Sequence, residues 1–112
     1  MDSIRQNKIA RMLQKELAVI FQAESRNYFP GKLITVTMVR VSPDLGLAKV
    51  YLSIYPRKKD EDIIAEVTQH SSMIRNALGR VIRHQVRVIP ELAFYIDDSM
   101  DYVERIDRLL KS

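Results

Sequence analysis

Residues 74–92 read IRNALGRVIRHQVRVIPEL and set a glycine inside a helix-like pattern of apolar residues. Gly79 admits three interpretations. A helix tolerates a glycine at a cost of about 1 kcal/mol relative to alanine. A glycine also caps the C-terminus of a helix, or bends the chain between two short helices and exposes amides at the start of the second. Arginines on both sides of Gly79 suit a phosphate backbone, so we expect the bend.

The charges are strongly segregated along the chain. Residues 75–87 hold four arginines, one histidine and no acid, whereas residues 91–107 hold six acids and one arginine. The formal net charge is +4 and the pI is near 9.5. This distribution indicates one face for an anionic partner such as nucleic acid. The alternative is an ordinary solvated surface.

Length and composition favour a single domain over residues 1–112. The chain is 46% hydrophobic and 29% charged, as in globular proteins, and it contains no cysteine, which excludes disulfides and thiolate chemistry. The opening residues lack a secretory signal, and no apolar run is long enough for a membrane span. We therefore expect a cytoplasmic protein that does not enter a membrane.

The first segment, from Ser3 to about Glu24, is predicted to be a helix with Ser3 as N-cap. Its apolar residues repeat at helical spacing on one side. A basic stripe runs beside them and consists of Arg5, Lys8, Arg11 and Lys15.

The rest of the chain predicts strands first and then helices. Residues 34–42 and 47–55 are β-branched or alternating runs, and the turn residues 42–46 between them predict a hairpin. A second helix is expected to follow the charged connector 56–62 and to end near Ala77, and a short helix is expected over residues 80–84.

A third strand over 85–97, with Pro90 at an edge or bulge, is predicted to precede a closing helix capped by Asp98 or Ser99. These elements predict an α+β two-layer domain, with a three-stranded sheet covered on one face by helices.

No residue pattern in the chain supports catalysis. His70 and His84 fall in different helices and have no metal-ligand spacing, and the glycine-rich phosphate-binding and nucleophile motifs are missing. The paired Asp97 and Asp98 precede a helix, where carboxylates cap free amides. We expect neither an enzyme nor a bound cofactor or metal.

The predicted order of elements resembles the type II KH domain, a single-stranded nucleic-acid module. Its G-x-x-G loop is missing, and ALG, residues 77–79, resembles the A-x-G kink between helices in the ribosome-binding factor A family. Three longer stretches are similar to that family: RQNKIARMLQKELAVIF, VRVSPDLGLAKVYLSI and IRNALGRVIRHQVRVIPELAFYIDDSMDYVERIDRLL. The implied fold is α-β-β-α-kink-α-β with a C-terminal helix.

This resemblance implies a non-catalytic assembly factor that binds the small (30S) ribosomal subunit and the 16S rRNA precursor. It implies a role in late rRNA processing, notably in the cold, and release aided by an assembly GTPase. We expect a monomer. The alternatives are a generic KH-like domain for single-stranded nucleic acid and a protein-interaction module with a basic face.

The predicted RNA-binding residues comprise the basic stripe of the first helix and the surroundings of the expected bend. Each charged residue has the alternative role of a solvated or ion-paired helix residue. The full set is Arg5, Lys8, Arg11, Lys15, Arg75, Ala77, Gly79, Arg80, Arg83 and Arg87.

Overall fold

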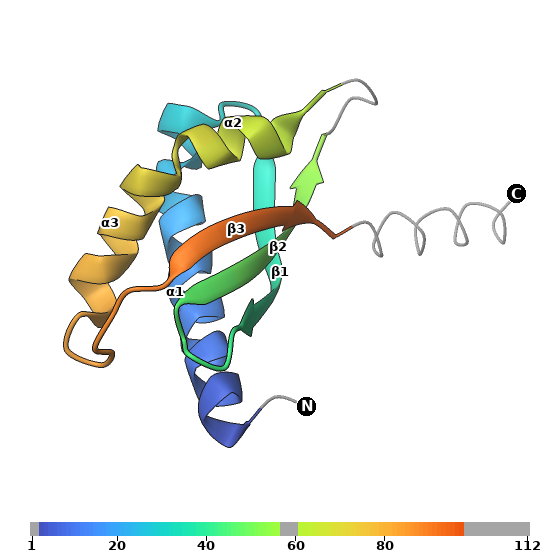
Figure 1. The fold of residues 1–112 in the computed structure, drawn as a ribbon. Helices are drawn as coiled ribbons and strands as arrows, with labels where there is room; N and C mark the ends of the chain where they lie inside the picture. Colours follow the sequence, from blue (N-terminus) through green and yellow to red (C-terminus); the bar gives the residue numbers. More distant parts are fainter. Residues whose placement is uncertain (1–2, 57–60, 98–112) are drawn as a thin grey trace, which may run out of the picture.

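A computed structural model describes residues 3–56 and 61–97 of the chain. The order of elements is helix α1 (Ile4–Tyr28), strands β1 (Leu33–Val41) and β2 (Leu47–Tyr55), helices α2 (Ile63–Gln69) and α3 (Ser71–Ile82), and strand β3 (Glu91–Ile96). The helices gather to one side of the strands (Figure 1). This arrangement confirms the predicted α+β class. The predicted closing helix lies outside the described residues.

Helix α1 begins at the predicted cap. The Ser3 hydroxyl accepts a hydrogen bond from the Gln6 amide at 3.1 Å, and the Ser3 amide donates to Gln6 Oε1 at 2.9 Å. This reciprocal pair is a capping box, which satisfies two helix-end donors. The buried Gln6 side chain also donates through Nε2 to the carbonyl of Val41, at 2.9 Å. One side chain therefore ties the start of α1 to the end of β1.

The sheet has the order β1-β2-β3. β1 and β2 form the predicted antiparallel hairpin, with an irregularity between Val36 and Met38, and β3 lies parallel to β2. Alternate residues of each strand point toward the helices, as strand geometry requires. Those inward residues form the core together with α1 and α3, and the rings of Phe21 and Phe94 meet edge to face at 6.1 Å.

The hairpin turn is held by its own side chains. The Ser42 hydroxyl donates to Asp44 at 2.6 Å, and the Gly46 amide donates to the same carboxylate oxygen at 3.0 Å. These two bonds hold the pKa of the Asp44 carboxyl below its usual value. Leu45 has a φ of 62°, a conformation that a leucine adopts only where its surroundings impose it. The turn is therefore a fixed shape at one end of the sheet.

The third strand is shorter than predicted. It begins at Glu91, whose amide donates to the carbonyl of Gly46 at 2.9 Å. Pro90 has no amide to donate, and the carbonyls of Ile89 and Pro90 accept from Arg75 of α3. Residues 85–90 therefore lie outside the sheet.

The prediction of a bend at Gly79 is wrong. α3 runs through Gly79 to Ile82, and the Gly79 carbonyl accepts from the Arg83 amide at 2.9 Å, as in a continuing helix. Ile74, Leu78 and Ile82, spaced four apart, are all buried, which requires an unbroken helix across the glycine. Gly79 is thus the tolerated mid-helix glycine, and the separate helix expected over 80–84 does not form.

The interruption between the two helices lies at His70. The His70 imidazole lies 4.8 Å from the ring of Tyr28 and 5.5 Å from that of Phe29, measured between ring centroids. These two aromatic residues end α1, so the break forms where the second helical segment meets the end of the first. The α-β-β-α-kink-α-β order holds, with its kink earlier in the chain than predicted.

Candidate RNA-binding surface

The basic stripe of α1 lies on the side of the helix that faces away from the core. Its four side chains are exposed, whereas Leu13 and Leu17, on the opposite side, are fully buried. From Arg5 to Lys15 the stripe extends about 15 Å, at 1.5 Å per residue. The first turn of α1 contains no acid that would neutralise it. This side of the helix suits a phosphate backbone.

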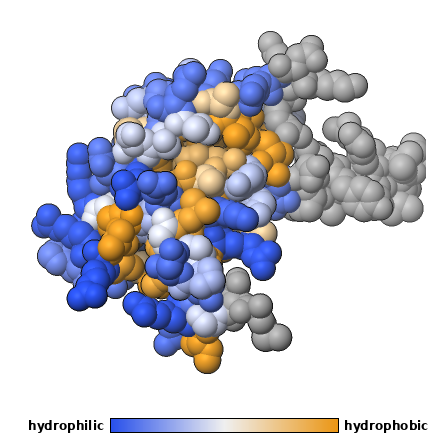
Figure 2. Space-filling view, viewed as in Figure 1, coloured by the Kyte–Doolittle hydropathy of each residue, from blue (hydrophilic) through white to orange (hydrophobic). Residues whose placement is uncertain are grey.

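The second group of cations stands at the end of α3, which packs beside α1. Arg80 and Arg83 are exposed, and Arg83 Nε lies 3.3 Å from His84 Nε2. Figure 2 shows mostly hydrophilic residues over α3, with an apolar strip among them. Cations at a helix C-terminus also compensate the helix dipole, so these arginines stabilise α3 in addition to any ligand they bind.

Ala77 and Gly79 differ from the other predicted site residues because they are only partly exposed and border the buried face of α3. Ala77 packs against the core, and a Cβ added at Gly79 would lie 3.5 Å from the Ile89 side chain. Inside α3 their amides belong to the helical ladder, so the free amides expected at a bend do not form there. That geometric support is therefore missing, and contact of either residue with RNA stays a prediction.

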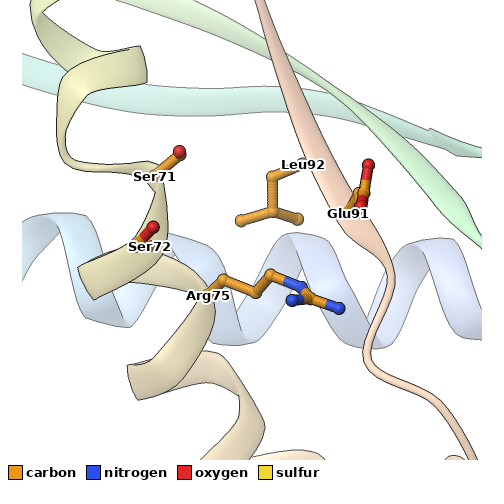
Figure 3. A pocket seen from close by; sticks show the side chains of 5 residues that line it. All are labelled: Ser71, Ser72, Arg75, Glu91 and Leu92. Carbon is orange, nitrogen blue, oxygen red and sulfur yellow. The ribbon is translucent and has the colours of Figure 1, made fainter.

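Arg75 makes two hydrogen bonds to backbone. Its Nε donates to the carbonyl of Pro90 at 3.0 Å, and its NH2 group donates to that of Ile89 at 2.7 Å. The guanidinium reaches from α3 toward β3 across a hollow of about 200 Å³, which Ser71, Ser72, Glu91 and Leu92 also line (Figure 3). Arg75 therefore fixes the path of the chain into β3.

Arg5 and Arg87, far apart in sequence, line one hollow of about 390 Å³. The turn residues Pro43, Asp44 and Leu45 form another part of its wall. The structure thus brings one cation of the α1 stripe to the last arginine of the basic segment 75–87. Helical spacing predicted the stripe and the charge distribution predicted the basic segment, but their meeting depends on the tertiary fold.

Sequence reasoning missed His70 as the break, because nothing near it resembles a helix terminator. The signal lay in the adjacent aromatics Tyr28 and Phe29 of another element. Within residues 3–56 and 61–97, no three histidine or acidic side chains are grouped so as to hold a metal ion. In that same part of the chain no helix is long and apolar enough to cross a membrane.

Comparison with known proteins agrees with this architecture. The family model of ribosome-binding factor A matches residues 5–110. The ribosome-binding factor A of Cytophaga hutchinsonii is 47% identical over 110 residues, which cover 98% of this chain and 83% of that protein.

Two solved structures extend the likeness to three dimensions. The crystal structure of ribosome-binding factor A from Thermus thermophilus has a TM-score of 0.66 at 25% identity, over 81% of this chain and 94% of that one. The second is a homology model of the Thermus thermophilus protein, fitted into the cryo-EM map of a complex of ribosome-binding factor A with the 30S subunit. It has a TM-score of 0.63 at 27% identity, over 80% of this chain and 91% of that one. Because the family model spans nearly every residue and the likeness includes both sequence and fold, this chain belongs to the ribosome-binding factor A family.

Proposed function

We propose that this protein is a non-catalytic assembly factor that binds the small (30S) ribosomal subunit through 16S rRNA. The supporting observation is its likeness to the Thermus thermophilus protein fitted into a complex with the 30S subunit. The exposed cations of α1 and α3 supply the chemistry that such a partner requires, because rRNA presents closely spaced phosphates.

The proposed contact surface consists of the exposed cations described above. Arg5, Lys8, Arg11 and Lys15 present charges along α1, and Arg80, Arg83 and Arg87 extend the surface at the end of α3. In this proposal Arg75, Ala77 and Gly79 act by holding the chain in place around them. Such contacts fix position on the RNA more than they read its sequence.

Co-sedimentation with isolated small subunits across a salt series tests the proposal. Affinity should fall steeply as salt rises, since each phosphate contact releases counterions. The double variant Arg80→Glu/Arg83→Glu should bind more weakly. The slope of its log affinity against log salt concentration should also be shallower, by the amount expected for about two phosphate contacts. Lys8→Glu/Arg11→Glu should behave in the same way if α1 shares the interface.

Arg26→Glu is the matched control for a single reversal at Arg11. Both arginines are exposed on the same side of α1, but Arg26 lies in its last turn, about 16 Å beyond Lys15 at 1.5 Å per residue. Equal losses from Arg11→Glu and Arg26→Glu would indicate a response to net charge alone. Wild-type protein that fails to sediment with subunits at low salt would refute the proposed function.

Two further experiments separate the remaining functions. A short oligonucleotide that competes with subunits at equal concentration would favour a generic single-stranded binding domain. A captured partner that survives nuclease digestion would favour a protein-interaction module.

The finer parts of the proposal follow the family resemblance. We propose action as a monomer in the cytoplasm, on the 16S rRNA precursor late in its maturation, with release aided by an assembly GTPase and the largest effect in the cold. A strain that carries Arg80→Glu/Arg83→Glu should accumulate unprocessed 16S precursor at low temperature. Normal processing in the cold would contradict this part.

A further inference from the structure

The sheet has a second face, which points away from the helices. Along β2 the residues that face outward alternate with the buried core residues, and they include Lys49 and Tyr51. The exposed fraction is 42% for Met38 on β1 and 43% for Tyr95 on β3. Large side chains that remain this accessible on both sides of the central strand form one exposed patch, which is typical of a surface for a ligand.

A pair of stacked tyrosines occupies the centre of this outer face. Tyr51 and Tyr95 are direct partners in the parallel register of β2 and β3, and their ring centroids lie 5.4 Å apart with planes at 27°. Met38 is the partner of Tyr51 on β1 and therefore lies on the far side of that ring. Tyr95 stands on β3, the last strand of the sheet, so no strand among the described residues follows it. Its outer ring face can extend the stack by one more flat group.

Positive charge lies one row away from the rings. Lys49 precedes Tyr51 by two residues, about 6.6 Å along the strand, and its partner across the hairpin is Arg40. Both cations and Tyr51 line a hollow of about 370 Å³, together with Pro43 and Leu47. Among the described residues, the acids of this face stand at the two ends of β3: Glu91 at the start, and Asp97 just after it, where its carboxylate accepts from Thr37 Oγ1 at 2.6 Å.

We propose that this outer face binds unpaired RNA, with a base stacked on Tyr95 and a phosphate beside Lys49. A stacking ring beside a cation is the pairing by which proteins hold single strands, because every base has a flat face and every nucleotide a phosphate. RNA as the natural ligand rests on the proposed function. The basic surface of α1 lies on the opposite side of the helical layer, so the protein would hold two RNA segments, one on each side.

Binding of a short, end-labelled single-stranded oligoribonucleotide, followed by the fluorescence anisotropy of its label, tests this inference. The chain has no tryptophan and five tyrosines, so in the wild type stacking on Tyr95 should also quench part of the tyrosine emission. Tyr95→Leu should weaken binding by about fivefold or more, the lower limit for one stacked base. Tyr95→Phe keeps the ring and is the matched control, with near wild-type affinity.

Lys49→Met separates charge from stacking. It should make the slope of log affinity against log salt concentration shallower, by the amount expected for about one phosphate contact. Tyr95→Leu should leave that slope unchanged. The lysine variant also keeps the inference testable if Tyr95→Leu fails to fold. Wild-type affinity in both Tyr95→Leu and Lys49→Met would overturn the inference, as would capture on this face of a protein that survives nuclease.

The two proposals can fail separately. Subunit binding that depends on Arg80 and Arg83, together with oligonucleotide binding that ignores Tyr95, would leave the proposed function and remove the second surface. Oligonucleotide binding that depends on Tyr95, without any binding to small subunits, would leave the second surface and remove the proposed function.

Discussion

His70 and Gly79 lie nine residues apart in one helical segment, and the chain breaks at the histidine and not at the glycine. Intrinsic propensity favours the opposite outcome, because glycine is the weaker helix former by about 0.5 kcal/mol. At Gly79, however, Leu78 and Ile82 on the same helix are buried. At His70 the imidazole contacts the two aromatic residues that end α1.

The difference shows that packing, and not propensity, decides where this helix is interrupted. Helices in proteins owe most of their stability to the apolar face that they bury. A continuous α3 buries side chains at positions 74, 78 and 82, which outweighs the cost of one glycine. Packing does not require a glycine at position 79 either, because an added Cβ would make an ordinary contact with Ile89 at 3.5 Å.

Leu78→Ala should have the largest effect on this comparison. Leu78 is fully buried on the face that α3 packs against the core, so truncation should lower the free energy of unfolding by about 2–5 kcal/mol. Denaturant unfolding measures the loss. Val81→Ala, on the exposed side of the same helix, is the control and should change stability by less than about 0.5 kcal/mol. Similar values for the two variants would contradict the burial of this face of α3.

His70→Ala should have the next largest effect. It removes the ring contacts to Tyr28 and Phe29, and aromatic pairs contribute about 0.5–1.5 kcal/mol each. Because two pairs are lost, we expect the free energy of unfolding to fall by about 1–3 kcal/mol. His84→Ala, at the exposed end of α3, should be nearly neutral. A neutral His70→Ala would show that the aromatic contacts do not set the break.

Arg75→Met tests the segment that covers Gly79. The variant keeps an unbranched apolar stem but removes the bonds to the carbonyls of Ile89 and Pro90. Because the guanidinium is exposed, the loss should be about 1 kcal/mol, below the usual range for charged hydrogen bonds. Hydrogen exchange should speed up at Glu91, next to the released carbonyls. Unchanged exchange there would contradict the anchoring role of Arg75.

Gly79→Ala should have the smallest effect and the opposite sign. In a continuous helix the alanine gains up to about 1 kcal/mol of propensity, and its Cβ makes an ordinary contact with Ile89. Thermal unfolding should therefore show equal or slightly higher stability. A clear loss of stability would favour the bend instead, because it would indicate a backbone conformation at position 79 that is unsuited to alanine.

The parts of the fold that short-range patterns determine were predictable. Ser3 is the N-cap of α1, and strand 47–55 begins and ends where its alternation does. The start of β3 was not predictable, since it depends on where Gly46 and Arg75 bind the backbone of residues 89–91. The closing helix remains a prediction outside the described residues.

The candidate site divides in the same way. Helical spacing revealed the stripe of α1, whose residues share one face whatever the fold. The pairing of Tyr51 with Tyr95 and the meeting of Arg5 with Arg87 depend on contacts between distant segments. No local pattern encodes the register of a parallel strand pair that is joined through two helices.

The Gln6 side chain has a consequence for how tightly RNA can be held. By accepting from Ser3 and donating to Val41, it prevents α1 from rolling about its own axis on the sheet. Arg5, Lys8, Arg11 and Lys15 therefore emerge from a backbone whose orientation is already set before RNA arrives. A preorganised array loses less conformational entropy on association than four cations on a loop. A buried glutamine that touches no ligand should thus make binding tighter.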